Sequence, residues 1–514
     1  MRTRSIDIEP LSLALSALGS GQAWLVGGRI RDRLLDRPCL DTDLAVADGA
    51  IELARAIARA SSGTAVVLDA ARDVARVVWP GSPTRSLDIA RLTSESIDAD
   101  LRLRDFTVNA MALPLDAAGI DRLADGGPVL RERLLDPRGG LADLDQGILR
   151  LTAARALDDD PLRMLRALRL AAELRFEIDP ESAVAIRSRA ALASRPAGER
   201  QRGELLRLLA ADRGAHDIAR LDHLGLLEPV LPELAATRGV QQSLPHDRDV
   251  YQHCLASLAA VELLQALLAR PSTDGDDPPC LRAMSAGGAI EIEPAWQGVI
   301  ERNRASLLAH ASAPGEIDRR LWWRMAALIH DIGKTETQRW DPGRGRFRFL
   351  GHDTKGAELI PGMGRRLRFS AQEARFLEGL LRHHLRPLHL AAAGGASARG
   401  IHHLFRDAGS IGVDVAFLAL ADNASKGGVR PDFAGHLAQV TGALFDAWFE
   451  HPELTVRPPM PLDGRELMQA LALSPGPQVG QLLAQIAEAI AVGELPPGDR
   501  EAAIALARHQ LERR

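Results

Sequence analysis

The chain contains 514 residues, of which 46% are hydrophobic, and its formal net charge is −5 at pH 7. This length is enough for about three or four domains, because single domains typically contain roughly 100–200 residues. No apolar run approaches the roughly 18–20 residues of a membrane span, and three scattered cysteines are too few for a disulfide framework or a zinc cluster. We therefore expect a cytoplasmic protein, and its net charge alone does not require a nucleic-acid partner.

Residues 1–150 contain short strand-like runs between helical segments. The runs are rich in β-branched and apolar residues and are bounded by glycine, proline or aspartate; in order they read AWLVGG, TDLAV, TAVVLD, VARVVW and RSLDIAR. They predict a small β-sheet domain at the start of the chain.

Asp41 precedes the run TDLAV and Asp43 lies within it, so two carboxylates are placed two positions apart. Side chains alternate along a strand, so both carboxylates face the same way, roughly 6–7 Å apart along the backbone. Mg²⁺ takes one or two protein carboxylates and completes its shell with phosphate oxygens and water. Asp88 offers a third carboxylate on another run. The pattern predicts a magnesium site for phosphoryl transfer, with exposed aspartates on an edge strand as the alternative.

Gly27 and Gly28 precede this carboxylate pair and a short basic segment. Glycine lets the backbone approach a triphosphate closely, and the helix that follows would direct free N–H groups at it. We therefore expect the segment to line the phosphate side of a nucleotide site.

From residue 151 the pattern becomes helical. The segments DPLRMLRALRLAAEL and GELLRLLA repeat apolar residues at three- and four-residue spacing. Strands are hard to find beyond this point, so we expect the last two thirds of the chain to be mostly α-helical. Residues 270–288 and 391–400 are rich in glycine, proline or small residues and predict flexible connections.

Asp160 and Arg163 are three residues apart, which would place them on one face of a helix. A carboxylate that accepts from an exocyclic amino group, beside a guanidinium that donates to the ring, fits cytosine and adenine. Uracil and guanine would set a carbonyl against the carboxylate, and an unpaired buried polar group costs about 1–3 kcal/mol. A helix N-cap at Asp160, ahead of Pro161, is the structural alternative.

Histidines and aspartates gather in the segments DVYQHCL, ALIHDIGK, FLGHDTKGAEL, LRHHLRP and LALADNASKGG. Imidazole and carboxylate together suit a divalent transition metal such as Mn²⁺, Ni²⁺, Co²⁺ or Fe²⁺. The three lysines of the chain, Lys334, Lys355 and Lys426, fall in the same segments, whereas the other 60 basic residues are arginine. We expect their ammonium groups to hold a phosphate near the metal.

Five motifs of the first 209 residues resemble the class II tRNA nucleotidyltransferases, which include bacterial CCA-adding enzymes and poly(A) polymerases. In order they read GGRIRDRLLDR…DTDL, LRLRDFTVNAMAL, GGLADLDQGILRLT, DDDPLRMLRALR and GERQRGELLRLL. The second departs at Leu103, where the family commonly has arginine, and the fourth has Asp159 in place of glutamate. The resemblance implies an α+β fold: a nucleotidyltransferase head with a small mixed β-sheet, then a mostly α-helical neck, body and tail.

His253, His330, Asp331 and Asp422 resemble the H…HD…D pattern of HD-domain phosphohydrolases, and His352 and His384 would complete a wider ligand set. Residues 458–495 resemble the C-terminal segment of family members that carry an HD domain. We therefore expect a head at 1–150, a base- and RNA-binding neck at 151–237, an HD domain at 238–450 and a helical tail at 451–514.

The resemblance also assigns roles in the head. Asp41 and Asp43, with Asp88, are expected to be catalytic and to hold Mg²⁺, and two such ions would activate the attacking hydroxyl and steady the pyrophosphate. The remaining nucleotide-binding residues are expected to be Gly27, Gly28, Arg31 and Asp32 at the triphosphate, Arg104, Asp105 and Asn109 at the sugar and phosphates, and Asp160, Arg163 and Arg166 in the neck.

The expected function is addition of CMP or AMP from CTP or ATP to the 3′ end of tRNA, without a template. Binding of tRNA should be electrostatic, through arginines of the neck and tail. Fifteen residues separate Asp88 from Arg104, fewer than in CCA-adding relatives, so an enzyme that adds the terminal A is one alternative. A poly(A) polymerase is another, and an HD phosphohydrolase whose head only binds RNA is a third.

Overall fold

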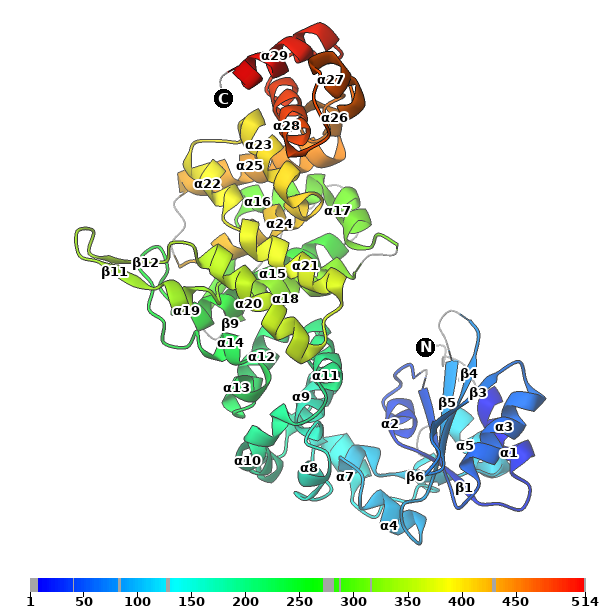
Figure 1. Cartoon of the computed structure of the whole chain (residues 1–514). Helices are drawn as coiled ribbons and strands as arrows, with labels where there is room; N and C mark the ends of the chain where they lie inside the picture. The colour runs from blue at the N-terminus through cyan, green and yellow to red at the C-terminus, as the bar shows by residue number, and fades with distance from the viewer. Residues whose placement is uncertain are drawn as a thin grey trace. The chain divides into compact units, whose positions relative to one another are not determined.

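The protein is described by a computed structural model (Figure 1), in residues 8–39, 41–81, 85–125, 130–270, 282–285, 288–314, 317–427 and 431–512. Its contacts divide the chain into two compact units. The first comprises Met1–Pro196 and Leu224–Leu226, and the second comprises Ala197–His223 and Leu227–Arg514. The predicted neck thus contributes residues to both units, and the four-domain division stays a prediction.

A six-stranded mixed sheet forms the centre of the first unit, in the strand order β3-β4-β5-β2-β1-β6. The strands are β1 Ala23–Val26, β2 Asp41–Val46, β3 Thr64–Asp69, β4 Val74–Trp79, β5 Arg85–Arg91 and β6 Ala112–Pro114. All five predicted runs are strands, and β6 is an addition. β2 and β5 are parallel, whereas the other neighbouring strands are antiparallel. Because β2 lies between β1 and β5, the edge-strand alternative is wrong.

One face of this sheet packs against helices. In α3 (Ala50–Ala60) the buried positions Ala50, Leu53, Ala54 and Ile57 follow helical spacing and face the strands. α1 (Glu9–Leu18) packs beside α3, and the apolar side chains of both join the sheet core. In β5, Leu87 and Ile89 are buried in that core, so the alternate residues, including Asp88, lie on the opposite face.

Shorter elements lie between the strands of the sheet or follow it into the neck. They are α2 Gly28–Leu34, α4 Ile97–Leu101, the 3₁₀ turn η1 Thr107–Asn109, α5 Ala117–Asp125, α7 Gly140–Gln146, β7 Ile148–Leu149, α8 Ala156–Asp159, α9 Arg163–Leu174, β8 Glu177–Ile178, α10 Pro180–Arg189 and η2 Ala190–Ser194. Gly140 lets α7 approach η1, because a Cβ there would lie 2.2 Å from the carbonyl oxygen of Thr107. α9 is the helix predicted from the apolar spacing.

The second unit is built around α15 (Val250–Ala269), which packs against α18 (Arg319–Ile329) and α24 (Ile411–Ala424). Within the described residues, α15 alone is long and apolar enough to cross a membrane, and 67% of its apolar stretch is buried in the protein. Its composition is therefore that of a core helix. α20 (His352–Leu367) and α21 (Ala371–His383) pack against each other beside it.

The remaining helices of this unit are α11 Gly198–Ala210, α12 Gly214–His223, α13 Leu227–Val230, α14 Pro232–Ala235, α16 Pro294–Arg302, α17 Arg304–Ala311, α19 Lys334–Thr337, α22 Arg386–Ala392, α23 Ala398–Ala408 and α25 Pro431–Phe449. At the C-terminal end α26 Pro452–Thr455, α27 Gly464–Leu471, α28 Pro477–Ala491 and α29 Arg500–Glu512 follow, and the last three share an apolar core of their own. The expected helical tail is present.

Two small hairpins interrupt the helices, and the rest of the described residues beyond 151 are mostly helical, as expected. The hairpins are β9 Arg282–Ser285 with β10 Gly288–Glu291, and β11 Arg339–Asp341 with β12 Arg346–Arg348. The predicted flexible segment 270–288 falls mostly outside the described residues. The segment 391–400 contains the turn between α22 and α23, where Gly394 has a φ of +93°. The predicted fold class, a small mixed sheet followed by helices, is confirmed.

Candidate functional site

Asp43 and Asp88 lie directly opposite each other in the parallel pairing of β2 with β5. Residues in register on neighbouring strands project to the same face, so the sheet brings these two carboxylates together. The backbone of Asp41 is in register with Ser86, while the Asp41 side chain lies outside the described part of the chain. The register between β2 and β5 thus brings Asp43 and Asp88 together, which side-chain alternation along one strand cannot predict.

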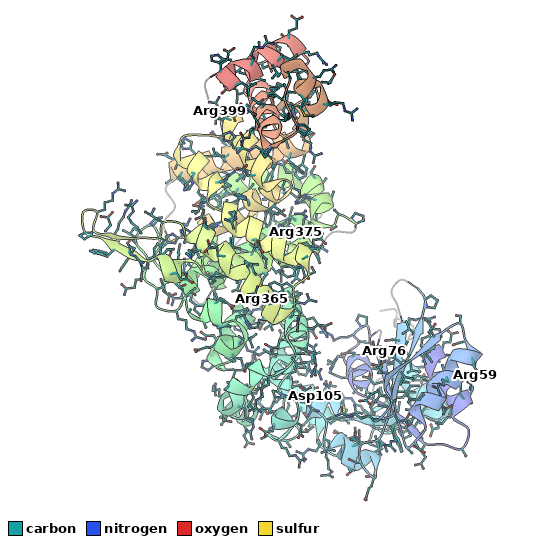
Figure 2. The ribbon with its side chains drawn as sticks, viewed as in Figure 1. Arg59, Arg76, Asp105, Arg365, Arg375 and Arg399 are labelled. Atoms are coloured by element: carbon teal, nitrogen blue, oxygen red, sulfur yellow. The ribbon has the colours of Figure 1, made fainter. Side chains whose placement is uncertain are left out.

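Arg76 joins this face from β4, and the sequence analysis missed it. Its Nε and Nη2 donate to the two carboxylate oxygens of Asp88 at 2.6 and 2.7 Å (Figure 2 labels Arg76). Arg76 lies between the buried residues Ala75 and Val77, so the alternation in VARVVW indicates that its side chain is on the face away from the core. Its partner follows only from the register between β4 and β5.

Gly27 provides close approach at the same place. Its φ is +76°, and a Cβ at this position would lie 2.9 Å from Oδ2 of Asp43 and 3.8 Å from Nη1 of Arg104. Any other residue would therefore be strained in its backbone and would crowd the carboxylate. The close neighbour in the structure is a carboxylate of the chain itself, and the approach to a triphosphate stays a prediction.

A hydrogen-bond chain joins five of the predicted nucleotide-binding residues. Arg31 donates to Asp32 at 2.9 Å and to Oδ1 of Asn109 at 2.7 Å. Asn109 donates to Oδ1 of Asp105 at 3.1 Å, and Arg166 of α9 donates to Oδ2 of the same carboxylate at 3.2 Å. The buried Asp105, labelled in Figure 2, therefore connects the head to helix α9 of the neck.

Asp160 and Arg163 do not share a helix face, and this expectation is wrong. Asp160 follows the end of α8, and its Oδ1 accepts from the backbone N–H of Leu162 at 3.1 Å. Arg163 is the first residue of α9 and donates to the backbone oxygens of Ala156 at 3.2 Å and Leu103 at 3.4 Å. Asp160 thus sits in a turn before the helix, close to the capping alternative.

In the second unit four histidines converge on Asp331. His253 comes from α15 and His330 ends α18, while His352 begins α20 and His384 ends α21. Their Nε2 atoms lie 3.4, 3.4, 3.2 and 3.8 Å from carboxylate oxygens of Asp331.

Asp422 of α24 stands beside the same cluster, with Oδ1 at 3.0 Å from Nε2 of His253. The sequence order of these residues therefore does predict a spatial cluster, and all six of the expected ligands are buried.

The other ring nitrogen of each histidine is held in place. Nδ1 of His330, His352 and His384 lies 2.9, 2.7 and 2.6 Å from the backbone oxygens of Ala327, Phe349 and Leu381, and Nδ1 of His253 lies 2.9 Å from Oγ of Ser425. Such bonds fix the ring orientation and the tautomer, leaving Nε2 as the ligand atom. The Nε2 atoms of His253 and His330 are buried and lie 3.0–3.7 Å from carboxylate oxygens of Asp331 and Asp422, an arrangement that fits a bound cation.

Two overlapping groups in this cluster have the reach of a metal site. His253, His330 and Asp331 form one, and Asp331, His352 and His384 form the other, with ligand atoms within 4.8 Å of one another in each group. Nitrogen and carboxylate donors in this combination suit Zn²⁺-like and other first-row transition ions better than Mg²⁺. The residues present therefore fit the divalent metal that the pattern predicts.

The charges in the cluster are unequal. Burial lowers the pKa of His253 to about 4 and that of His384 to about 3. For His330 burial also acts downward, but the charges and hydrogen bonds of Asp331 and Asp422 outweigh it and raise its pKa to about 10. At neutral pH the metal-free cluster thus holds a charged His330 between two carboxylates whose own pKa values are well below normal.

Two of the three lysines reach this site. Nζ of Lys334 lies 2.6 Å from Asp331, and Nζ of Lys426 lies 3.0 Å from Asp422. Lys355 instead pairs with Glu358 at 2.9 Å, so its role in holding a phosphate near the metal stays a prediction.

A pocket of about 330 Å³ opens onto the cluster, and its walls include His246, Lys334 and Lys426. The sequence analysis missed His246, which no predicted segment contains.

Three family models match the chain. Residues 23–150 match the poly A polymerase head domain, 175–237 the probable RNA and SrmB-binding site of polymerase A, and 304–426 the HD domain. A nucleotidyl-transferring head followed by an HD domain is therefore the class that the fold and the two sites define.

Curated relatives extend this likeness over nearly the whole chain. The A-adding tRNA nucleotidyltransferase of Deinococcus radiodurans is 34% identical over 480 residues, 92% of each chain. The CC-adding enzyme of Thermus thermophilus is 30% identical over 92% of this chain and 90% of its own, and that of Geobacter sulfurreducens is 43% identical over 40% and 44%. The chain belongs to the tRNA nucleotidyltransferase and poly(A) polymerase family, and it is an enzyme of that family.

Solved structures agree on the fold. A CCA-adding enzyme in complex with CTP superposes with a TM-score of 0.61 at 18% identity, covering all of both chains. The Thermotoga maritima CCA-adding enzyme with tRNA superposes with a TM-score of 0.57 at 18% identity, covering 99% of this chain and 97% of that one.

Proposed function

We propose that the head adds nucleotides to the 3′ end of tRNA from CTP or ATP. The observation that carries this proposal is the placement of Asp43 opposite Asp88, beside Gly27, on the polar face of the sheet. The 3′ hydroxyl of the RNA attacks the α-phosphorus of the nucleotide, and pyrophosphate leaves. Mg²⁺, held by Asp41, Asp43 and Asp88, would lower the pKa of the hydroxyl and neutralise the leaving group.

Around this centre the chain positions the nucleotide. Gly27 and Gly28 leave room for the triphosphate, and the hydrogen-bonded set Arg31, Asn109 and Asp105 supports its sugar and phosphates. Base choice by Asp160 and Arg163 requires Arg163 to exchange its two carbonyl contacts for the base. Exposed arginines of the neck and tail, such as Arg195 and Arg508, supply charge for tRNA. Because the proposed substrates are tRNA and nucleotides, we propose that the enzyme acts in the cytoplasm.

We propose further that only the terminal A is added. The segment between β5 and α4 is short and pinned, because Thr93 donates from both its N–H and its hydroxyl to Oδ1 of the buried Asp100, at 3.0 and 2.8 Å. Arg104 pairs with the same carboxylate at 3.4 Å. A fixed segment cannot reshape the base site between CTP and ATP, so a single nucleotide specificity is expected. The full-length A-adding relative favours A.

A CC-adding enzyme is the second candidate, because one CC-adding relative is 43% identical over 40% of the chain and another is 30% identical over 92%. The test compares two tRNAs, one ending at the discriminator base and one ending in CC, each with labelled CTP or ATP. We expect A on the CC-ended tRNA and little extension of the shorter one. Addition of CC alone would favour the second candidate. Sequential addition of C, C and A would favour a full CCA-adding enzyme, and addition of long A tails would favour a poly(A) polymerase. If no nucleotide were added to either tRNA, the alternative of a head that only binds RNA would remain.

For the second unit we propose a metal-dependent phosphohydrolase. His253, His330, Asp331 and Asp422 would hold a transition ion, and His352 and His384 lie within reach of Asp331. Bound there, the ion supplies a Lewis acid and a water of lowered pKa. Purified protein should carry stoichiometric Mn²⁺, Ni²⁺, Co²⁺ or Fe²⁺ by elemental analysis, and a variant with both His330→Ala and Asp331→Ala should lose the metal and any phosphatase activity but keep nucleotide addition. Loss of both activities would contradict separate sites.

A further inference from the structure

The β11–β12 hairpin stands at the mouth of the metal pocket. The β12 strand and the segment after it, from Arg346 to Leu350, line the pocket together with His352, His384 and Lys334. Figure 1 shows the hairpin projecting from the helices of its unit, between α19 and α20. A molecule that enters the pocket therefore passes along the hairpin.

The two faces of the hairpin differ in chemistry. Trp340 pairs with Phe347 in the strand register, and their ring centroids lie 5.0 Å apart. Trp340 is 54% exposed, so it contributes little to a core and presents an aromatic surface to solvent. The neighbouring register positions pair Arg339 with Arg348 and Asp341 with Arg346, which places the charges on the other face.

Positive charge on the hairpin exceeds what Asp341 neutralises. Asp341 lies 3.3 Å from Arg348 and 4.0 Å from Arg344. Arg339 donates to the backbone oxygen of Gln338. Arg346, at the pocket wall, has no ion-pair partner among the described residues. In a chain whose net charge is −5, two uncompensated guanidinium groups on the hairpin, one of them at the pocket wall, fit an anionic ligand.

The hairpin is anchored at its base. The N–H of Phe347 donates to Oγ of Ser243 at 2.8 Å, and the amide of Gln338 donates to the backbone oxygen of Gln241 at 2.9 Å. Lys334 donates to Oε1 of Gln242 at 2.7 Å. These bonds fix the hairpin to one loop beside the pocket, so its aromatic and cationic groups keep a constant position relative to the cluster.

We propose that the β11–β12 hairpin binds a single strand of RNA, and that the metal pocket takes a phosphate ester at the end of that strand rather than a free nucleotide. The proposal rests on the phosphohydrolase function proposed above. Bases stack on exposed aromatic rings, and arginines contact the phosphates of the same strand. A pocket of about 330 Å³ is at the small end of ligand sites, so it admits one end of a strand and leaves the rest on the hairpin.

Binding is tested with the full chain and a fluorescently labelled single-stranded RNA of twelve nucleotides. Trp340→Ala should weaken binding about tenfold through lost stacking. Arg346→Ala should reduce the slope of log affinity against log salt by about 0.7, the value for one phosphate of a single strand. Arg375→Ala on α21 removes an exposed arginine away from the pocket walls and is the matched control (Figure 2). Equal losses in the control and the hairpin variants would overturn the proposal.

Activity separates this inference from the function on which it rests. With Mn²⁺-loaded enzyme, both hairpin variants should raise KM for a 3′-phosphorylated RNA strand at least fivefold and leave p-nitrophenyl phosphate hydrolysis within twofold. Equal effects on the two substrates would overturn the hairpin role. If wild-type enzyme hydrolyses neither substrate, the phosphohydrolase proposal fails. Crosslinking with 4-thiouridine RNA then tests RNA binding by the hairpin independently of hydrolysis, and the crosslinks should map to residues 338–350. Crosslinks outside this segment, or equal competition by an acidic peptide, would overturn RNA binding by the hairpin.

Discussion

Single side chains set the chemistry on the polar face of the sheet. Asp43 and Asp88 face each other across two parallel strands, and Arg76 holds Asp88 by two hydrogen bonds. The types and order of the carboxylates are visible in the sequence. Their opposition is not, because it depends on which strands pair, in which direction and in which register. Arg76 was missed for the same reason.

Asp43→Asn should lower nucleotide addition at least a hundredfold, because the substitution removes a negative charge from the proposed Mg²⁺ site while keeping the shape of the side chain. The midpoint of thermal unfolding and the affinity for tRNA should stay close to wild type. Asp121→Asn, at an exposed position of α5, is the matched control. If Asp43→Asn retained more than a few per cent of activity under Mg²⁺, the ligand assignment would be wrong.

Arg76→Ala tests whether Asp88 is a metal ligand. The guanidinium competes with a cation for this carboxylate, so its removal should lower the Mg²⁺ concentration that gives half-maximal activity. The pair is partly exposed, at 44% for Arg76 and 30% for Asp88, so its loss should cost only about 0–1 kcal/mol of stability. A titration of activity against Mg²⁺ measures the effect. An unchanged Mg²⁺ requirement would show that Asp88 does not contact the ion.

At the scale of elements, long periodic segments were predictable and short ones were not. The five strand runs and α9 follow from residue pattern, whereas β6 and the β11–β12 hairpin have three residues per strand and too little pattern to detect. Asp160 was expected on a helix, but the helix begins after it, at Arg163. The histidine cluster was predictable as a set, while its geometry depends on backbone oxygens at three helix ends.

Because helices α15, α18, α20, α21 and α24 force these ligands together, metal binding should release a proton. The raised pKa of His330, about 10, keeps this imidazole charged at neutral pH, yet only the neutral form binds a metal. Affinity for Ni²⁺ should therefore rise about tenfold per pH unit between pH 6 and 8. Calorimetry in two buffers of different ionisation enthalpy measures the proton released. An affinity that does not change with pH would contradict a charged His330.

At the scale of the whole molecule, the chain forms two compact units, each held together mainly by its own internal contacts. We expect the two units to unfold in separate steps, because multidomain proteins often do not unfold in a single two-state transition. A metal that binds the folded second unit at 100 times its Kd stabilises it by about 2.7 kcal/mol, a rise of about 4 °C for a unit of this size. Scanning calorimetry with Ni²⁺ should move one transition and leave the other. His330→Ala should abolish the shift, and His451→Ala, an exposed histidine, should not. Movement of both transitions together would contradict independent units.

The scarcity of lysine has a practical consequence for labelling this protein. The side chains of Lys334 and Lys426 are 7% and 10% exposed and are tied to carboxylates, whereas Lys355 is 48% exposed. Lys355 also pairs with Glu358, which raises the pKa of its amine, so amine-directed reagents at alkaline pH will react at Lys355 and at the α-amino group. Lys355 lies on α20, one turn from His352, so a dye on this amine reports from beside the metal cluster without any engineered cysteine.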